Sequence, residues 1–196
     1  MKSEWHDIIF NVNIKLEPDN FFVKCVNEKI KERLEIWRDV IYSSFGENLP
    51  CIWKDFIEHK KILYIADPEA LPFVGLYEIV NTEDNGKPIA IILITFDPVN
   101  LSASVDLLCA NEEFSKKYPF LSGRLVVQLL KTMVRIFKQL KPLYVIMLVI
   151  EWNTGINSVV KKLGYKRRAF LPDYFLIQSN DAFRRKGAVI WDKFYR

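Results

Sequence analysis

The stretch Tyr144-Val-Ile-Met-Leu-Val-Ile150, followed by Glu151-Trp-Asn153 and by a segment that ends in Gly164-Tyr165, decides the fold of this chain. An apolar run without alternation is typical of a strand covered on both faces, as in a parallel or central strand of an α/β sheet. Apolar residues then recur with the spacing of one helical face, and Gly164 stands where helices commonly end in a left-handed conformation. We therefore expect a strand deep in a sheet, then a turn and a short helix.

The same stretch resembles the last conserved block of the GNAT-type N-acetyltransferases. In that family the block commonly reads N-x-x-A-x-x-x-Y-x-x-x-G-F, and here it reads Asn153-Thr-Gly-Ile-Asn-Ser-Val-Val160-Lys-Lys-Leu-Gly164-Tyr165. The Asn, the Gly and the final aromatic residue keep their spacing, whereas Val160 stands where many members have a Tyr. The resemblance implies one GNAT-like α/β domain over residues 1–196, with a mixed, mostly antiparallel central sheet and helices on both faces.

Composition agrees with one globular domain. The chain has 196 residues, of which 50% are hydrophobic, enough for a core of its own. Its apolar runs fall short of the ~18 to 20 residues that cross a bilayer, and its start lacks the apolar core of a signal peptide, so we expect a soluble, cytoplasmic protein without a membrane partner. Cys25, Cys51 and Cys109 are widely spaced and expected to be free thiols. With only His6 and His59 available, no metal site is predicted.

The order of predicted elements agrees with the GNAT layout. Alternation predicts an edge strand over residues 8–16, and an apolar stripe predicts a helix over residues 26–45 that stops at Gly46. A shorter helix is expected around Trp53-Lys-Asp-Phe-Ile57. Further predictions are strands over residues 62–66, 74–80, 89–96 and 103–109, a long helix over 122–140, and a last antiparallel pair over about 168–177 and 188–194. Surface loops are expected over residues 111–120 and 178–187, and turns at Asp67-Pro68, Asp84-Asn85-Gly86 and Asp97-Pro98-Val99-Asn100.

The resemblance implies acetyl-CoA as co-substrate. In the family, a turn of the form R/Q-x-x-G-x-G/A before the long helix holds the pyrophosphate with backbone N–H groups and the helix dipole. The matching stretch is Tyr118-Pro-Phe-Leu-Ser-Gly123-Arg124, in which only the last glycine fits. Ser122, Gly123 and Arg124 are therefore the candidate phosphate contacts, with Lys116 and Lys117 as additional charge. The alternative is that Ser122 is an ordinary helix N-cap.

The pantetheine arm of CoA lies, in the family, against free backbone groups of the fourth strand, where that strand parts from the fifth. By position those groups belong to Leu107, Leu108 and Cys109. Asn153 follows the fifth strand, and the resemblance makes it a further contact for the arm. It is equally expected as the N-cap of the helix that follows, a role that Asn commonly fills.

Proton transfer lacks its usual donor, because Val160 occupies the position of the family's general acid and an aliphatic side chain has no proton to give. Tyr174 is the candidate replacement, while Tyr165 is expected to pack in the core. Asp106 and Glu151 are the candidate bases, since a carboxylate beside an apolar strand wall has a raised pKa. The alternative for both carboxylates is an ordinary edge or surface charge.

The sequence thus predicts transfer of an acyl group, expected to be acetyl, from acyl-CoA to an amine of a small molecule or protein, by direct attack in a ternary complex. Two alternatives stay open. A GNAT fold without catalysis would serve as a binding or assembly module, since fold does not fix function. The net charge of +4, concentrated between Lys161 and Lys186, would also suit a nucleic acid, but no recognised nucleic-acid motif is present and polyanionic CoA explains the same charge.

Overall fold

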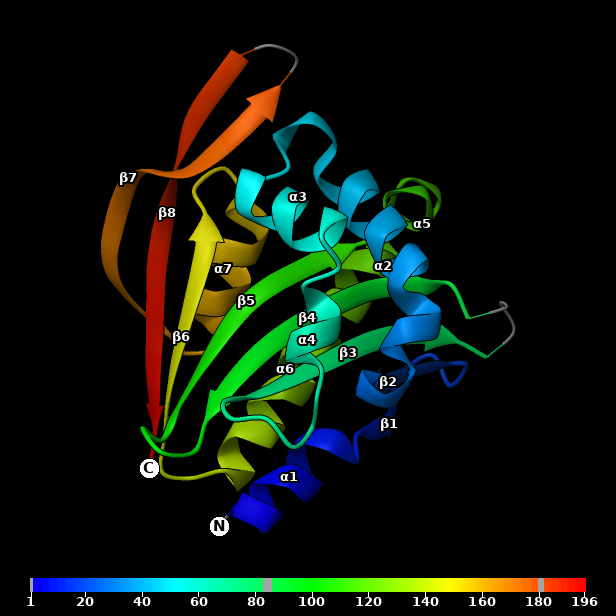
Figure 1. The fold of residues 1–196 in the computed structure, drawn as a ribbon, viewed down its shortest axis with the longest axis vertical. Helices are drawn as coiled ribbons and strands as arrows, with labels where there is room; N and C mark the ends of the chain where they lie inside the picture. Colours follow the sequence, from blue (N-terminus) through cyan, green and yellow to red (C-terminus); the bar gives the residue numbers. More distant parts are fainter. Residues whose placement is uncertain (1, 83–85, 180–181) are drawn as a thin grey trace.

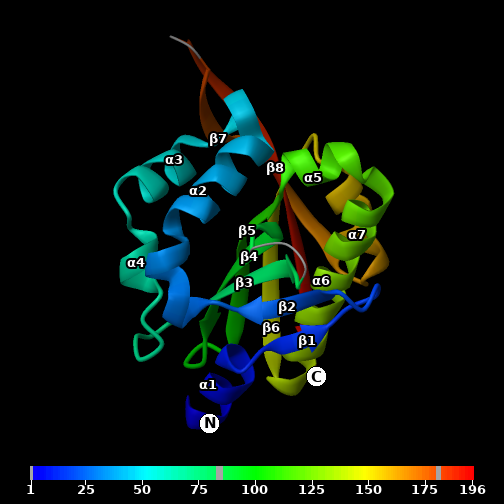
Figure 2. The same ribbon diagram turned by 90° about the vertical axis from the view of Figure 1, so that its right-hand side faces the viewer.

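An eight-stranded sheet organises the molecule and carries helices on both faces (Figures 1 and 2), which confirms the expected mixed α/β architecture. The computed structural model describes residues 2–82, 86–179 and 182–196. The strands are ordered β1-β2-β3-β4-β5-β6-β8-β7, and β5 with β6 is the parallel pair. They span β1 (Asn13–Lys15), β2 (Phe21–Cys25), β3 (Phe73–Asn81), β4 (Pro88–Asp97), β5 (Ser102–Ala110), β6 (Leu143–Ile150), β7 (Lys166–Ser179) and β8 (Ala182–Tyr195). The helices span α1 (Lys2–Phe10), α2 (Ile30–Phe45), α3 (Cys51–Glu58), α4 (Ile62–Ile65), α5 (Glu112–Lys117), α6 (Pro119–Gln139) and α7 (Thr154–Lys162), with 3-10 turns η1 (Asn27–Lys29) and η2 (Gly46–Asn48).

Each face of the sheet carries its own apolar core. Side chains of α1, α6 and α7 form the core of one face, in which Phe96 and Phe137 are fully buried. Side chains of α2, α3 and α4 form the core of the other, centred on Trp37 of α2. Figure 2 shows the sheet edge-on between α2, α3 and α4 on one side and α6 and α7 on the other. Burial of such large side chains stabilises the fold by roughly 1.5–3 kcal/mol each.

The two parallel strands, β5 and β6, diverge along their length. Their pairing ends at Val105↔Met147, although β5 continues to Ala110 and β6 to Ile150. The β4–β5 ladder shifts register at Asp106, which makes that residue a β-bulge. Because a bulge bends and twists its strand, it turns the second half of β5 away from β6. This divergence positions the candidate site.

The bulge also changes which core each side chain of β5 enters. Before it, Ala103 and Val105 are buried in the core beneath α6. After it, Leu107 and Cys109 are buried in the core beneath α2. Asp106 therefore lies where the strand exchanges its two faces.

The apolar run over residues 144–150 forms β6, as predicted. The prediction that this strand is buried on both faces is wrong. Alternate residues from Leu143 to Val149 are buried beneath α6, whereas Ile146, Leu148 and Ile150 on the other face are half-buried. Helix α2 packs mainly over β4 and β5, and α3 contacts β7, so this face of β6 is less covered. The half-buried face borders the cavities described below.

Two predicted strands are helical instead. Residues 8–10 complete α1, and of the predicted strand over residues 8–16 only Asn13–Lys15 forms β1. Trp5 and Ile9, four residues apart, are both buried. This helical spacing begins before the predicted strand, and residues 8–10 follow it. The predicted strand over residues 62–66 is α4, in which Ile62 and Ala66 are buried at the same spacing. A short apolar run is compatible with either period.

Both predicted loops contain regular structure. Residues 112–117 form α5, and Asn111 caps it by accepting a hydrogen bond from the backbone N–H of Phe114 at 3.0 Å. Most of residues 178–187 belong to β7 and β8, which continue as a hairpin arm beyond the other strands (Figure 1). Both segments are rich in polar residues, which is typical of exposed loops. Polarity alone does not indicate whether an exposed segment is a loop, a helix or a strand. In the predicted turn at residues 84–86, Gly86 has a φ of 77°, and Asp84 and Asn85 lie outside the described residues.

Candidate active site

The divergence of β5 and β6 creates two adjoining cavities. The first, of about 150 Å³, passes between the strands and reaches Asn153, Ile156 and Val160 near and on α7. The second, of about 630 Å³, lies on the opposite side of the sheet, between α3 and β7. Both cavities share lining residues, namely Trp53, Asp106, Leu148 and Phe175. A group in the first cavity therefore meets a group in the second beside Asp106.

The carboxylate of Asp106 is half-buried and held by two hydroxyl groups. Thr95 Oγ1 donates to one carboxylate oxygen at 2.6 Å, and Ser104 Oγ donates to the other at 2.6 Å. Burial raises the pKa of Asp106 above its ordinary value, although the hydrogen bonds from Ser104 and Thr95 oppose that shift. A carboxylate with two such bonds still has lone pairs for a further donor. Asp106 is thus arranged to receive a proton or to bind an ammonium group.

The structure brings Tyr174 to Asp106 but not Glu151. Tyr174 lines the second cavity, remains 51% exposed and packs edge-on against Phe175 with ring centroids 4.9 Å apart. It lies in the irregular part of β7 and directly follows Asp173, whose φ is 55°. Glu151 instead accepts a hydrogen bond from the backbone N–H of Gly187 at 3.0 Å and lines a separate surface groove. Its position favours the alternative that Glu151 is a surface charge. The hydrogen bond from Gly187 fixes the point at which the buried part of β8 begins.

Val160 and Asn153 line the first cavity from the α7 side. Val160 is fully buried there, so the position of the family's acid is apolar in the structure as in the sequence. Asn153 caps α7, because its Oδ1 accepts a hydrogen bond from the backbone N–H of Ile156 at 3.1 Å. The cap uses the Oδ1 atom, and Asn153 also lines the cavity, so capping and cofactor contact are compatible roles.

The predicted backbone contacts on β5 lie beyond the bulge. Leu107, Leu108 and Cys109 pair with β4 on one edge of the strand. Leu107 and Leu108 line the first cavity, whereas the side chain of Cys109 is buried in the core beneath α2. In the first half of β5, the edge that faces β6 is paired with that strand. Beyond the bulge, the same edge borders the first cavity.

The turn expected to hold a pyrophosphate differs from its prediction. Helix α6 begins at Pro119, so Ser122 and Gly123 lie inside the helix, and the expectation that the helix begins at or is capped by Ser122 is wrong. Ser122 is buried, its N–H donates to the carbonyl of Tyr118 at 2.9 Å, and its hydroxyl lies 2.7 Å from that of Ser115. Pro is typical of the first helical position, and this signal identifies the true start.

Arg124 is also occupied elsewhere, since its guanidinium donates to the Glu17 carboxylate at 3.0 Å. The groups at this end that remain suited to an anion are the first backbone N–H groups of α6, at Phe120 and Leu121, which helix geometry leaves without intrahelical partners. Lys116 and Lys117 stand one turn earlier, at the end of α5. The phosphate end of the candidate site therefore shifts towards the start of α6.

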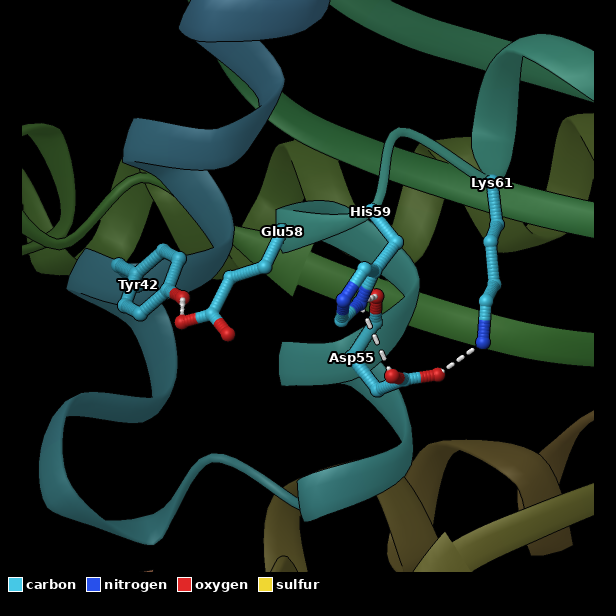
Figure 3. A network of polar contacts seen from close by, with 5 residues as sticks. All are labelled: Tyr42, Asp55, Glu58, His59 and Lys61. Carbon is cyan, nitrogen blue, oxygen red and sulfur yellow. Dashed lines mark hydrogen bonds and ion pairs between the residues drawn. The ribbon is translucent and has the colours of Figure 1, made fainter.

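Helix α3 supplies one wall of the second cavity and is fixed by polar contacts on its outer side (Figure 3). Tyr42 of α2 donates to the Glu58 carboxylate at 3.0 Å. Asp55 accepts a hydrogen bond from Lys61 and lies 3.0 Å from the Nδ1 atom of His59. These contacts hold the pKa of Asp55 below its usual range, with Lys61 as the main cause.

The opposite wall is joined to the same helix. Pro50, directly before α3, forms an isolated bridge with Ile177 of β7. Trp53 and Phe56 of α3 form an edge-on pair with ring centroids 5.5 Å apart. The sequence predicts this short helix but not the cavity, because nothing in a local pattern indicates that α3 and β7 face each other.

The late basic residues are divided among several places: Lys161, Lys166 and Arg167 line one surface groove, and others lie outside it. Arg168 donates to the buried carboxylate of Asp192 at 2.5 Å, and the Lys186 ammonium lies 5.5 Å from the ring centroid of Trp152. The other cations of this group divide between α7, the start of β7 and the hairpin arm. A phosphate backbone would need them along one groove or stripe.

None of the three cysteines forms a disulfide bond. Cys25, Cys51 and Cys109 are free thiols, as predicted. Within residues 2–82, 86–179 and 182–196, helices long and apolar enough to cross a membrane are absent. The same ranges contain no group of three His, Cys, Asp or Glu side chains suited to a metal ion.

Solved structures resemble this arrangement, although no protein-family model and no curated protein matches the sequence. A ribosomal-protein-S18-alanine N-acetyltransferase from Escherichia coli matches with a TM-score of 0.62 and 12% identity, covering 88% of this chain and 92% of that chain. A ribosomal L7/L12 α-N-protein acetyltransferase in complex with coenzyme A matches with a TM-score of 0.66 and 8% identity, covering 90% and 94%. The chain has the GNAT fold.

A third similar structure is of an acetyltransferase named for a different acceptor. Mutant forms of the spermidine/spermine N-acetyltransferase from Vibrio cholerae match this domain with a TM-score of 0.61 and 11% identity, over 89% of this chain and 94% of that chain. These likenesses establish the fold of a divergent GNAT domain along nearly its whole length. The chemistry has to be argued from the residues of this chain.

Proposed function

We propose that this GNAT domain transfers an acyl group, acetyl in the first instance, from acyl-CoA to a primary amine. The observation that carries the proposal is the meeting of two cavities at Asp106, one passing between β5 and β6 and one opening between α3 and β7. Such an arrangement lets two reactants approach from different sides and meet beside a carboxylate. The similar structures support it, since each is described as an acetyltransferase and one contains coenzyme A.

The space between β5 and β6 suits the extended arm of an acyl-CoA. Beyond Val105 the free edge of β5 borders the first cavity, so amide groups of a ligand can pair there as an added strand would. Leu108, Ile156 and Val160 give the cavity apolar walls. The pyrophosphate would lie at the first turn of α6, where exposed N–H groups and the helix dipole favour an anion.

In the proposed reaction, the amine nitrogen forms a bond to the acyl carbon as the carbon–sulfur bond breaks. The bound ammonium group first gives one proton to the carboxylate of Asp106, whose pKa is raised by burial, and the free amine then attacks; the nitrogen releases a second proton to solvent as the amide forms. The sulfur leaves as a thiolate and is protonated by the Tyr174 hydroxyl or by solvent, because Val160 has no proton to give. Holding both reactants in one orientation supplies a large part of the acceleration.

The test is release of free thiol from acetyl-CoA in the presence and absence of a mixture of primary amines. We expect amine-dependent release that is lost in Asp106→Asn. Release that does not depend on amine would indicate hydrolysis instead of transfer, and would contradict the proposal.

A second candidate function is a GNAT-fold binding module without catalysis. Two observations favour it: Val160 replaces the general acid, and Arg124 is paired with Glu17 instead of facing a phosphate. The hairpin arm, with Phe183 64% exposed, would be its contact surface. Saturable acetyl-CoA binding without transfer to any amine would favour this alternative over the enzyme.

A further inference from the structure

The second cavity has walls that are mainly aromatic and aliphatic. Trp53 and Phe56 form an edge-on pair on α3, and Tyr174 and Phe175 form an edge-on pair on β7, with ring planes at 84° and 89°. Such pairs are rigid and favour flat apolar groups between them. At about 630 Å³, the cavity has the size of a small-molecule site.

The charge of the cavity is limited to one group. Of the described residues that line it, Asp106 alone is acidic, and the Thr95 hydroxyl beside it is already bonded to that carboxylate. The nearby acids of α3 are unsuited to a ligand in the cavity. Figure 3 shows Asp55 and Glu58 joined to His59, Lys61 and Tyr42 on the outer side of the helix. A ligand in the second cavity therefore meets one negative charge among the described lining residues, that of Asp106.

The mouth of the cavity is apolar and bordered by positive charge. Ile52 is 68% exposed and Leu176 is 39% exposed, and both line the cavity. Arg185 of β8 pairs opposite Leu176, and directly opposed residues of an antiparallel pair project to the same face. A second ammonium group would lie without a carboxylate in apolar surroundings and near a cation, which is costly.

A peptide is also poorly matched to these walls. Each peptide unit brings a donor and an acceptor that require partners when buried. The described lining offers few polar side chains beyond Asp106, Thr95 and the Tyr174 hydroxyl. Flat apolar groups, in contrast, gain from every wall.

We propose that the acceptor is a compact primary amine with one positive charge and an aromatic or aliphatic body, whose ammonium group lies at Asp106 and whose body lies between α3 and β7. The inference rests on the proposed function for its reaction, but amine binding is separate from transfer. Polyamines and peptide N-termini are the competing acceptor classes.

The first experiment measures binding without chemistry. Calorimetric titration of the CoA-saturated protein compares 2-phenylethylamine, spermidine and an alanine-led tetrapeptide. We expect 2-phenylethylamine to bind at least about tenfold more tightly than the other two, which is a difference of about 1.4 kcal/mol. Tighter binding of spermidine or of the peptide, or no saturable binding of 2-phenylethylamine, would overturn the proposal.

Two variants test the location. Phe56→Leu keeps an apolar wall but removes a ring from the second cavity alone, so the Kd for 2-phenylethylamine should rise about fivefold or more while that for acetyl-CoA stays constant. Leu176→Glu adds a carboxylate at the mouth and should improve spermidine binding. The matched control is Val99→Glu, on the exposed β4–β5 turn, which should change neither. Equal effects of Leu176→Glu and Val99→Glu would contradict the assignment of the mouth.

Transfer assays with the same amines separate this inference from the proposed function. If 2-phenylethylamine binds as described but is not acetylated, the enzyme proposal fails and the ligand class survives. If spermidine or the peptide is acetylated with the highest kcat/KM, the enzyme proposal survives and the ligand class is wrong.

Discussion

The two ends of the proposed acyl-CoA site are built from different kinds of structure. The thioester end depends on sheet geometry: a bulge at Asp106, the divergence of β5 from β6, and buried walls on both faces. The phosphate end depends on one turn, in which Ser122 is bonded internally and Arg124 is paired with Glu17. We infer that the sheet retains the site for the reacting groups, whereas the turn has lost most of the side chains that would bind phosphate.

The largest effect is expected at the thioester end. Asp106→Asn keeps the size of the side chain but cannot accept the amine proton, so kcat should fall by ~10²–10⁴-fold. In the native protein kcat should rise with pH through the raised pKa of Asp106, as the carboxylate forms, and the variant should lose this limb of the pH profile. Asp97→Asn, at the end of β4, is the control and should leave the profile unchanged. An unchanged rate in Asp106→Asn would remove Asp106 from the mechanism.

The same carboxylate predicts an effect on stability. Because the folded-state pKa of Asp106 is raised, ionisation costs stability as pH rises from the ordinary aspartate pKa through the raised value. Above that range Asp106→Asn should therefore be at least as stable as the native protein towards urea. Marked destabilisation at neutral pH would show that the two hydroxyl bonds outweigh the burial of the charge.

The missing acid allows a test in both directions. Val160→Tyr restores the family residue in the first cavity and should raise kcat by up to about 100-fold if the phenol reaches the sulfur. Tyr174→Phe should lower kcat only if Tyr174 protonates the thiolate. Rapid native turnover that neither change alters would contradict the proposed proton source. The free energy of unfolding should be measured for Val160→Tyr, because overpacking a buried site commonly costs about 1–3 kcal/mol.

Asn153 lies between the two ends and has two candidate roles. Asn153→Asp keeps an N-cap acceptor for α7 but replaces the amide donor with a charge, so acetyl-CoA binding should weaken about tenfold with little change in Tm. Asn153→Ala removes the cap as well and should also destabilise the protein by about 1 kcal/mol. Calorimetry and thermal unfolding of both variants separate the roles. Unchanged binding in Asn153→Asp would leave only the cap.

The smallest effects are expected at the phosphate end. Lys116→Glu with Lys117→Glu should weaken acetyl-CoA binding only about two- to fivefold, because exposed charge pairs contribute roughly 0.2–1 kcal/mol. Gly123→Ala should leave binding unchanged and stabilise α6 by about 1 kcal/mol, since a Cβ at this helical position meets nothing within 4 Å. A large loss of binding in Gly123→Ala would restore Gly123 as a phosphate contact and reverse the comparison between the two ends.

The sequence predicted those parts of the molecule that depend on long local patterns. The strands β3 to β6 and the helices α2, α6 and α7 follow from periodicity and from the Asn153 to Tyr165 spacing. Short segments such as α4 were ambiguous because a run of four or five apolar residues fits a helix or a strand. The predicted start of α6 at residue 122 follows the family pattern, whereas the helix begins at Pro119.

The candidate site was only partly predictable for a different reason. Asp106 and Tyr174 are candidates from the sequence, and their position in one cavity depends on a bulge and on the docking of β7 against α3, which no local pattern reveals. The aromatic residues Trp53 and Phe56 were predicted only as part of a short helix. Their role as a cavity wall follows only from the tertiary arrangement.

Binding of acetyl-CoA between β5 and β6 is tested most directly by calorimetric titration of the native protein and of two variants of α7. Ile156→Trp fills the first cavity, whereas Val159→Trp, on the same helix, introduces the same side chain outside it. We predict saturable binding to the native protein, at least about tenfold weaker binding to Ile156→Trp, and near-native binding to Val159→Trp, with the folded state of each verified by its Tm. Equal affinity of all three proteins, or no binding to the native protein at millimolar acetyl-CoA, would contradict the proposed site.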